Sequence, residues 1–509
     1  MTSRQKLIRT GLANRTTNKA GRDMTVDTTF QLLKTKRTKI IATLGPATFA
    51  SERIQQLIEA GVNLFRLNMS HGDYDGYIQA HTYIREASDR LNTSVGIIAD
   101  LCGPKIRTGQ FKDGPITLTP GQQVTITTRD VEGEDGLIPS QYEQIADDLS
   151  PGDRVLLADG TMELTVESID GTEVECVVVH GGELGSRKGI NLPGVEISAP
   201  SMTEKDFEDA VFALDLGVEY LALSFVRKPQ DLDELRDLIK KKRKRTGIIA
   251  KIEKPEAVER IEGIVDKADV LMVARGDLGV ELPVEQVPLI QDELVNYARS
   301  RNRPVIVATQ MLETMIENPT PTRAEVADIS HAVRSGVDAI MLSGETAIGK
   351  HPIKAVQLMS RVAKQAEGHI WNKAYFGSLA TQAPASITLS NPLRDAIANA
   401  TAMLSRDLQV RAILVPSTTG TTARVLSASR PAAPLVAFSS NIHTCRKLSL
   451  MWGVTPIYFE EADLYQLDKL ARHLTKRLEF ANEGQSILLV KGFNPDPSQN
   501  KPSITVLEL

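Results

Sequence analysis

The sequence has little cysteine and no long apolar run. Its 509 residues include only Cys102, Cys176 and Cys445, which are widely spaced and odd in number. They show neither metal-ligand spacing nor a disulfide framework, which favours a reducing compartment, and we expect a cytoplasmic protein. Because no apolar run is long enough to span a bilayer, we expect no membrane association. The net charge of −5 is too small to indicate nucleic-acid binding through bulk charge.

The length exceeds what one hydrophobic core normally supports, and this predicts two or three domains. The hydrophobic content of 41% and the charged content of 24% are typical of a globular protein. Residues 1–22 contain six basic residues, no acidic residue and no apolar core of a secretory signal. We expect residues 1–36 to form a disordered N-terminal extension, or the true start to be Met24. A transit peptide is the alternative.

The stretch 248–283 combines two strand patterns with a helix pattern. The apolar run Ile248–Ile252 contains Lys251 and ends at Glu253, and a helix-like segment follows. A second apolar run, Val270–Ala274, then leads to Asp277. The pattern predicts two buried parallel strands joined by a helix, with the charged side chains pointing inward at the carboxyl ends. In α/β barrels that face is where chemistry occurs.

The charged residues of this stretch suit a metal site. Glu253 and Asp277 could hold one hard divalent cation, with Lys251 beside them as a fixed positive charge. The alternative is a structural ion pair between Lys251 and Glu253. We favour a functional site, because burying such charges without a use is costly.

Eight strand patterns, each followed by an amphipathic helix, predict a (β/α)₈ TIM barrel over residues 37–104 and 193–371. Between the third strand and its helix, residues 105–192 form short β runs punctuated by Gly, Pro and Asp. They predict an inserted all-β domain that closes over the active face as a lid. Strands and helices alternate again over residues 372–509, which predicts a C-terminal α/β domain with a regulatory role.

Eight motifs occur in a fixed order along the chain. They are FRLNMSHG (65–72), GPKIRTG (103–109), RKGINLPG (187–194), AKIE (250–253), MVARGDLGVELP (272–283), ATQMLETM (308–315), PTRAEVAD (321–328) and MLSGETA (341–347). In this order they resemble the pyruvate kinase family over residues 37–509. The resemblance implies transfer of the phosphoryl group of phosphoenolpyruvate to ADP, giving pyruvate and ATP. It further implies a Mg²⁺ or Mn²⁺ cofactor and a homotetramer.

The resemblance also assigns catalytic roles. It implies that Glu253 and Asp277 ligate the divalent metal, and that Lys251 stabilises charge on the enolate and the phosphoryl group. The guanidinium of Arg66, at the end of the second strand, suits the phosphoryl group, with an ion pair across the barrel mouth as the alternative.

The substrate carboxylate, by the same resemblance, contacts the backbone N–H groups of Gly276 and Asp277 and the side chain of Thr309. Because threonine is not a strong base, we expect the proton to reach the enolate through water, with support from Ser343 and Glu345.

The ADP phosphates are expected at the second strand and at the lid. The residues implied there are Asn68, Met69, Ser70, His71, Arg107 and, once the lid closes, Lys188. For His71 the alternative is a helix cap.

The monovalent-cation pocket departs from the family pattern. Many members bind K⁺ through residues that match Asn68, Ser70, Asp100 and Leu101, and the last of these is commonly threonine. Lys105 stands where K⁺-dependent members usually have glutamate. Because an ammonium can replace K⁺ and repels a second cation, we expect that K⁺ is not required. The alternative is that Lys105 faces solvent.

A short hydroxyl-rich segment lies between a strand and a helix of the C-terminal domain. It consists of Ser417, Thr418, Thr419, Gly420, Thr421 and Thr422. Hydroxyl and N–H groups at a helix N-terminus form an anion site, and the resemblance implies a sugar-phosphate effector there. An ordinary capped turn is the alternative. The final loop, 492–503, lacks the glycine-rich form of several regulated members, so the sequence does not identify the effector.

Two other functions fit these motifs less well. Barrels that make or break C–C bonds in oxo-acids also hold Mg²⁺ on Glu and Asp, but would not need Arg66, Lys188 and a lid together. A non-catalytic sugar-phosphate sensor would tolerate the loss of Lys251 or Asp277. Residues 344–350 match a phosphate loop until His351 replaces the final Ser or Thr, so we interpret them as the loop after the eighth strand.

Overall fold

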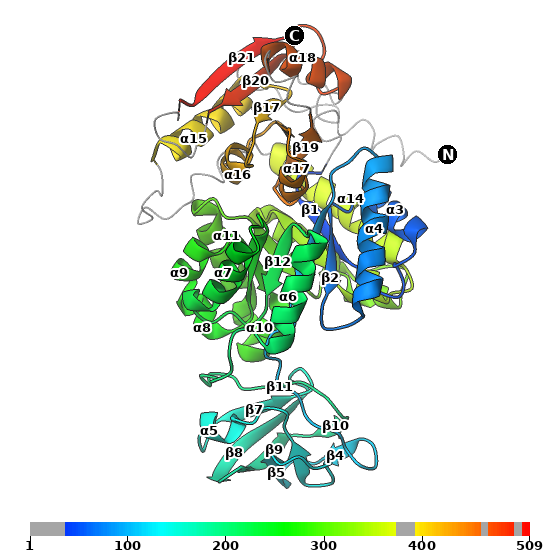
Figure 1. The fold of residues 1–509 in the computed structure, drawn as a ribbon, viewed down its shortest axis with the longest axis vertical. Helices are drawn as coiled ribbons and strands as arrows, with labels where there is room; N and C mark the ends of the chain where they lie inside the picture. The colour runs from blue at the N-terminus through cyan, green and yellow to red at the C-terminus, as the bar shows by residue number, and fades with distance from the viewer. Residues whose placement is uncertain (1–35, 373–391, 460–466, 493–500) are drawn as a thin grey trace, which may run out of the picture.

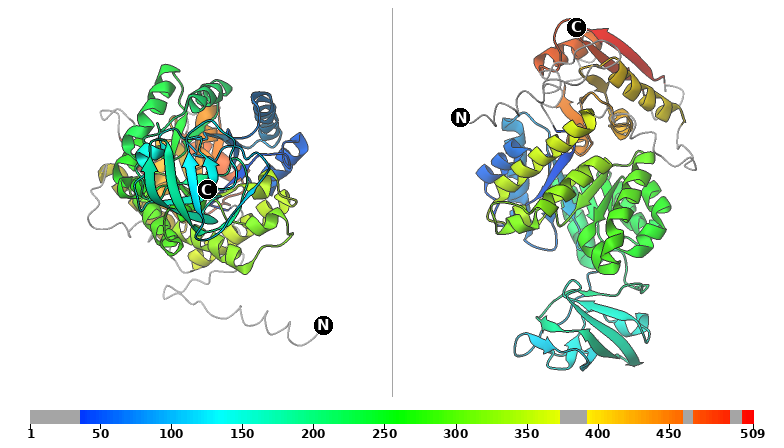
Figure 2. Two further views of the ribbon diagram at one scale, coloured as in Figure 1. Left: turned by 90° about the horizontal axis from the view of Figure 1, so that it is seen from below. Right: turned by 180° about the vertical axis from the view of Figure 1, so that it is seen from behind.

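The computed structural model describes residues 36–372, 392–459, 467–492 and 501–509. Three bodies follow one another along the long axis: the inserted β domain, the barrel and the C-terminal α/β domain (Figures 1 and 2). All but Lys36 of the expected N-terminal extension lies outside the described residues, as does most of the final loop, residues 493–500. No described helix has the length and apolar content needed to cross a membrane. The three cysteines are free.

Eight parallel strands close into a barrel, as predicted, in the order β1-β16-β15-β14-β13-β12-β3-β2. The strands are β1 (Lys39–Thr43), β2 (Leu64–Asn68), β3 (Gly96–Asp100), β12 (Tyr220–Leu223), β13 (Gly247–Ile252), β14 (Val270–Ala274), β15 (Val305–Ala308) and β16 (Ala339–Leu342). Because the sheet closes on itself, every strand has a partner on both sides and no edge remains.

Helices follow the strands and cover the barrel. They are α3 (Ser51–Ala60), α4 (Tyr74–Arg90), α6 (Glu204–Leu216), α7 (Asp233–Lys241), α8 (Pro255–Glu259), α9 (Ile261–Lys267), α11 (Val287–Ser300), α12 (Arg323–Ser335) and α14 (Pro352–Asn372). Local signals fix several ends. The capping box of Thr203 and Asp206 starts α6, and the left-handed Gly217 ends it.

The single helix predicted between Glu253 and Val270 is wrong. The segment forms α8 and α9, which are separated at Arg260, where φ is −103° and ψ is 21°. The break lets α9 approach the 3₁₀ helix η1 (Pro229–Leu232) closely: a Cβ on Gly263 would lie 2.5 Å from Cγ of Pro229. Tertiary packing therefore overrides the continuous helical pattern of the sequence.

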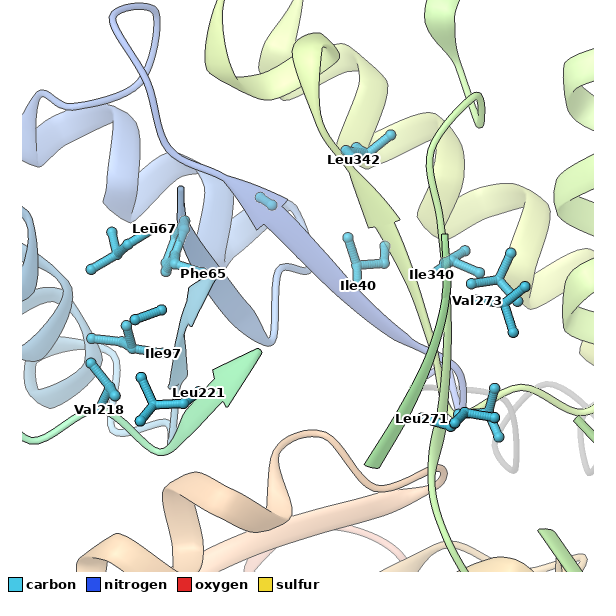
Figure 3. Packing of buried hydrophobic residues seen from close by; sticks show 14 of the residues in the cluster. Ile40, Phe65, Leu67, Ile97, Val218, Leu221, Leu271, Val273, Ile340 and Leu342 are labelled. Atoms are coloured by element: carbon cyan, nitrogen blue, oxygen red, sulfur yellow. The ribbon is translucent and has the colours of Figure 1, made fainter. Parts of the chain in front are cut away.

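Alternate residues of each strand face two separate apolar layers. The inner layer includes Ile41, Leu64, Ile98 and Ile249 and fills the barrel. The outer layer lies between the strands and the helices, and Figure 3 shows part of it, including Phe65, Ile97 and Leu221. This alternation decides which strand residues can reach the barrel mouth.

The inserted domain is a β domain with its own core. Its six-stranded sheet has the order β11-β7-β8-β9-β5-β6, and β10 pairs with β4 beside it. The strands are β4 (Ile116–Leu118), β5 (Gln123–Thr127), β6 (Leu137–Pro139), β7 (Arg154–Leu157), β8 (Met162–Asp170), β9 (Glu173–His180), β10 (Gly182–Leu184) and β11 (Ile190–Asn191), and one short helix, α5 (Ile145–Asp148), is present. We call this body the lid.

The C-terminal domain is a five-stranded sheet with the order β19-β18-β17-β20-β21, in which only β21 is antiparallel. Its strands are β17 (Ile413–Pro416), β18 (Leu435–Ser439), β19 (Val454–Tyr458), β20 (Ser486–Lys491) and β21 (Ser503–Glu508). Its helices are α15 (Pro392–Asp407), α16 (Thr421–Ala428), α17 (Ile442–Leu448) and α18 (Leu467–Arg477).

This domain packs on the amino ends of the barrel strands. Arg430 pairs with Asp338, just before β16, at 2.8 Å. Lys39, the first residue of β1, donates to the carbonyl of Val454 at 2.6 Å. Leu450 is fully buried within the inner layer of the barrel. The amino face is therefore covered, and the carboxyl face is left to the lid.

Candidate active site

Three charged side chains reach the carboxyl face because they continue the inner layer of their strands. Arg66 is two residues beyond Leu64, Asp100 is two residues beyond Ile98, and Lys251 is two residues beyond Ile249. Residues two apart on a strand share a face, so these charges point inward, as the sequence predicted for Lys251.

Lys251 is the centre of a buried charge cluster. Its Nζ lies 2.9 Å from Glu253 Oε1 and 3.4 Å from Asp100 Oδ1, and it donates to Ser224 Oγ at 2.7 Å. Burial by itself lowers the pKa of Lys251, but the negative charges of Asp100 and Glu253 outweigh it, and the pKa is raised. The ammonium is therefore a fixed positive charge. The structural ion pair of Lys251 with Glu253 is therefore present.

Arg66 pairs with Asp100 across neighbouring strands. Its Nε lies 2.6 Å from Asp100 Oδ2, and its Nη1 donates to Thr43 Oγ1 at 3.2 Å. Burial raises the pKa of Asp100, but the positive charges of Lys251 and Arg66 lower it by more. The pKa of Asp100 is therefore lowered overall. The alternative ion pair is thus present. It fixes the guanidinium at the barrel mouth.

Glu253 and Asp277 form an electrostatic pair. The backbone N–H of Phe225, at the left-handed φ of 53°, donates to Glu253 Oε2 at 2.7 Å. Burial raises the pKa of Glu253, Lys251 opposes that shift, and the neighbouring Asp277 raises it again. Asp277 is half-buried in the first turn of α10 (Arg275–Glu281). Two carboxylates held close despite their repulsion match the hard oxygen ligands that Mg²⁺ prefers.

Such a site would need ligands beyond the protein. Among the described residues, no group of three or more His, Cys, Asp or Glu side chains is placed to hold a metal ion. Glu253 and Asp277 therefore suit a Mg²⁺ site that is completed by substrate oxygens and water.

Thr309 has an unusual backbone, held by α10. Its φ is 69°, which is rare for a β-branched residue. The N–H of Gly276 donates to Thr309 Oγ1 at 2.8 Å, and Arg275 Nη2 donates to the Thr309 carbonyl at 2.7 Å. Arg275 also pairs with Asp328 at 2.7 Å. The structure thus brings together Gly276, Asp277 and Thr309, the residues expected at the substrate carboxylate.

The segment after β16 differs from its prediction. Residues Gly344–Ala347 form the short helix α13, and not the loop that the sequence indicated. The carboxylate of Glu345 accepts from the N–H groups of Ser343 at 2.7 Å and Leu312 at 3.0 Å, and burial raises its pKa. These backbone bonds hold the first turn of the helix.

The loop after β2 is tied down by Tyr77. Its hydroxyl donates to the Asn68 carbonyl at 2.6 Å and also contacts the carbonyl of His71. His71 is exposed, and the cap role considered for it is wrong, because Asp73 accepts the N–H of Gly76 and caps α4. The residues expected at the nucleotide lie together here. Met69 offers only its backbone, since its side chain packs in the outer layer.

The two expected nucleotide ligands of the lid lie on adjoining segments. Arg107 pairs with Gly189 in a β-bridge, and its Nη1 donates to the Arg187 carbonyl at 3.2 Å. Lys188 is exposed, and its N–H donates to Thr108 Oγ1 at 2.9 Å. Both are therefore carried by the lid, away from the cluster around Lys251.

Two of the four residues expected at a monovalent cation, Asn68 and Leu101, have oxygens that already accept hydrogen bonds. Asn68 Oδ1 accepts from the N–H of Ser70 at 3.4 Å, and the carbonyl of Leu101 accepts from Ser224 Oγ at 2.7 Å. Lys105 lies 3.7 Å from Asp159, a lid residue, and its side chain is 28% exposed.

The hydroxyl-rich segment of the C-terminal domain precedes α16 as expected. Gly420, with φ of 86°, is its N-cap, and Thr419 Oγ1 lies 3.0 Å from Thr421 Oγ1. Ser417 and Thr422 are buried, whereas Thr418 and Thr419 are exposed. Exposed hydroxyls at a helix start are suited to an anion.

Sequence analysis missed three residues that shape the site. Ser224 bridges Lys251 and Leu101, Phe225 supplies an N–H to Glu253, and Arg275 holds Thr309. Ser224 follows β12 at the same strand end as the other site residues, so that position was an available signal. The role of Phe225 depends on its backbone angle, for which the sequence has no marker.

Taken together, the barrel, its charged carboxyl face and the lid define a (β/α)₈-barrel enzyme suited to a phosphorylated substrate. Residues 35–356 match the family model described as "Pyruvate kinase, barrel domain", and residues 395–505 match "Pyruvate kinase, alpha/beta domain". The chain belongs to the pyruvate kinase family, and it is a phosphotransferase of glycolysis.

Individual relatives agree with the family. The chain is 43% identical over 462 residues to pyruvate kinase 2 of Synechocystis, covering 90% of this chain and 76% of the relative. It is 42% identical over 465 residues to the pyruvate kinase of Mycobacterium intracellulare, covering 90% and 96%. Among solved structures, a pyruvate kinase from Cryptosporidium parvum matches with a TM-score of 0.87 at 33% identity, covering 95% of this chain and 98% of that one.

Proposed function

We propose that the chain transfers the phosphoryl group of phosphoenolpyruvate to ADP at the carboxyl face of the barrel. The observation behind this proposal is the ammonium of Lys251, which is buried between Asp100 and Glu253 at the barrel mouth. A buried charge of this kind is suited to negative charge that develops during a reaction. The barrel holds it in advance, so little reorganisation is needed.

The bonds balance with one proton taken from water as the only further reactant. The P–O bond to the enol oxygen breaks, and a P–O bond to the β-phosphate of ADP forms. The enolate that is left takes a proton at carbon and becomes pyruvate. Arg66 binds the phosphoryl oxygens, and Lys251 stabilises the charge that passes to the enolate oxygen. The N–H groups of Gly276 and Asp277, with the hydroxyl of Thr309, orient the substrate carboxylate.

Glu253 and Asp277 are the proposed ligands of Mg²⁺ or Mn²⁺. A divalent cation bound there supplies positive charge to the enolate and phosphoryl oxygens. The proton reaches the enolate through water, because Thr309 is not a strong base. Ser343 and Glu345 support that path from the end of β16.

ADP is proposed to bind between the loop after β2 and the lid. Its phosphates meet Asn68, Ser70, His71 and the backbone of Met69 on the barrel side. Arg107 and Lys188 approach from the lid, so closure of the lid completes the site and excludes water.

The remaining expectations concern the effector, the need for K⁺, the cellular compartment and the oligomeric state. We propose that Ser417–Thr422 binds the phosphate of a sugar-phosphate effector, that K⁺ is not required, and that the chain works as a cytoplasmic homotetramer. The hydroxyls before α16 support the first of these, and the two cations that already flank Asp100 support the second.

A coupled assay tests the reaction. Pyruvate formed from phosphoenolpyruvate and ADP is detected through NADH oxidation by lactate dehydrogenase. We expect Mg²⁺-dependent turnover that needs both substrates. Asp277→Asn serves as the inactive control. Pyruvate release without ADP, or no release at all, would contradict the proposed function.

A further inference from the structure

A buried polar cluster of three residues lies beside the proposed metal ligands. Lys254 Nζ lies 2.6 Å from Glu281 Oε1, and Asn191 Nδ2 donates to the same oxygen at 3.1 Å. The side chains of Lys254 and Glu281 are 5% and 0% exposed. None of the three is among the residues assigned above to substrate, nucleotide or metal.

The cluster is joined by the chain to both proposed metal ligands. Lys254 directly follows Glu253. Glu281 is the last residue of α10, four residues after Asp277, so the two carboxylates lie on one side of this short helix, one turn apart. The Lys254–Glu281 pair therefore connects the end of β13 to α10 and fixes the spacing of the two segments that supply Glu253 and Asp277.

The third member of the cluster belongs to the lid. Asn191 lies on β11, where it pairs with Leu156 of β7 in the lid sheet. A second lid contact reaches the same turn of α10: a Cβ on Gly160 would lie 3.3 Å from Val280 Cγ1. The lid therefore touches the end of α10 at two neighbouring residues, one polar and one apolar.

The cluster is poorly explained as a device for stability alone. A buried ion pair is often no better than apolar residues of the same size, because both charges lose their water. In addition, Glu281 Oε2 is buried and has no hydrogen-bond partner in the described part of the chain. Such an oxygen is costly, and it leaves the carboxylate free to exchange donors when the lid moves.

We propose that Glu281 is a positioning residue for the metal pair, through which the lid controls the approach of Asp277 to Glu253. The inference rests on the proposed placement of the metal at these two carboxylates. With Asn191 bonded to Glu281, α10 is held at both its first and last turns. A movement of the lid that breaks this bond leaves the last turn of α10 held by Lys254 alone.

The direct test is Mn²⁺ binding to the free enzyme, measured by the electron paramagnetic resonance signal of unbound Mn²⁺. Glu281→Gln keeps the shape of the side chain but leaves Lys254 without its counter-charge. We expect the Kd for Mn²⁺ to rise by about 10-fold, the usual effect of removing a group that orients metal ligands. Glu196→Gln is the control, since it neutralises a carboxylate in an exposed ion pair, with Arg260 at 3.3 Å, outside the cluster.

Asn191→Ala removes only the lid contact and keeps the barrel pair intact. We expect a smaller rise in the Kd for Mn²⁺ than in Glu281→Gln. In the double variant Asn191→Ala, Glu281→Gln, the change in the free energy of Mn²⁺ binding should be well below the sum of the two single changes. This variant keeps the test decisive if Glu281→Gln does not fold. Additive effects would overturn the inference, as would an unchanged Kd in either single variant that melts like the wild type.

A separate outcome concerns the placement of the metal itself. If Asp277→Asn binds Mn²⁺ as tightly as the wild type does, the metal lies elsewhere and both proposals fail. If Asp277→Asn loses Mn²⁺ but Glu281→Gln and Asn191→Ala do not, only the positioning role of Glu281 is overturned.

Discussion

The ammonium of Lys251 lies 2.9 Å from the carboxylate of Glu253, two residues further along the same chain. The side chains of Lys251 and Glu253 are 12% and 1% exposed, and Asp100 adds a second carboxylate at 3.4 Å from the ammonium. The cluster thus holds one lysine between two acidic groups. Neutralising the lysine leaves Glu253 without its counter-charge and Asp100 with Arg66 alone, which links the charge of Lys251 to the electrostatics of the whole barrel mouth.

Lys251→Met is expected to leave phosphoenolpyruvate binding largely intact and to lower kcat by about a hundredfold or more. The reason is that Lys251 acts mainly on charge that develops in the transition state. Steady-state kinetics check the split between kcat and KM, and circular dichroism checks the fold. Lys240→Met, on the exposed face of α7, is the control. Near-normal turnover would remove Lys251 from the mechanism.

Asp277→Asn is expected to weaken divalent-metal binding and catalysis together. One of the two carboxylates loses its charge, so the site attracts a cation less strongly. The measurement is the Mg²⁺ concentration that gives half-maximal turnover, which should rise markedly. The chelator EDTA should abolish the wild-type activity, and added Mg²⁺ should restore it. An unchanged Mg²⁺ dependence in the variant would show that the metal has been misplaced.

Much of the fold could be predicted because the elements that pack together carry clear local sequence patterns. The eight barrel strands are apolar runs, and strand parity correctly placed Lys251 inside the mouth. Individual contacts between distant segments have no such pattern in the sequence. The bond from Asn191 to Glu281 joins residues 90 positions apart, and α9 packs at Gly263 against Pro229 of another element.

The contact between the barrel and the C-terminal domain predicts a large stability effect. Asp338 accepts from Arg430 at 2.8 Å, from the N–H of Val305 at 3.0 Å and from the N–H of Trp452 at 3.1 Å. Asp338→Ala leaves the guanidinium of Arg430 buried without its counter-charge, which costs about 3–5 kcal/mol. We expect a lower melting temperature by calorimetry. Asp407→Ala, in an exposed pair with Arg406, should be neutral. Equal melting of the two variants would contradict the prediction.

The proposed effector site can be tested by charge. Thr418 and Thr419 are exposed, whereas Thr422 is buried, so the acidic substitutions belong at the first two positions. The variant Thr418→Glu, Thr419→Glu should lose any activation by sugar phosphates through repulsion and keep its basal activity. Replacing both residues with valine separates loss of hydroxyls from repulsion, and should weaken activation less. Activation that survives the double glutamate variant would move the effector elsewhere.

Turnover is expected not to require K⁺. Asp100, an expected ligand of a monovalent ion, already lies 2.6 Å from the Arg66 guanidinium and 3.4 Å from the Lys251 ammonium. The carbonyl of Leu101 accepts the hydroxyl of Ser224, and its side chain offers no oxygen. A further cation would therefore meet two positive charges and few free oxygens. Lys105, whose partner Asp159 is a lid residue, adds a third positive charge on the lid side of this pocket.

The test compares turnover in buffers that contain only bulky organic cations with turnover after KCl is added at matched ionic strength, since salt screening also changes rates. We expect little change. Lys105→Glu should shift the enzyme toward K⁺ dependence, though incompletely, because Leu101 still denies the ion a side-chain oxygen. Lys105→Gln is the matched control, since it removes the positive charge without adding a negative one. A many-fold, saturable rise with K⁺ in the wild type would defeat the prediction. A Lys105→Glu variant whose turnover does not change with K⁺ would show that Lys105 plays no part in the monovalent-cation requirement.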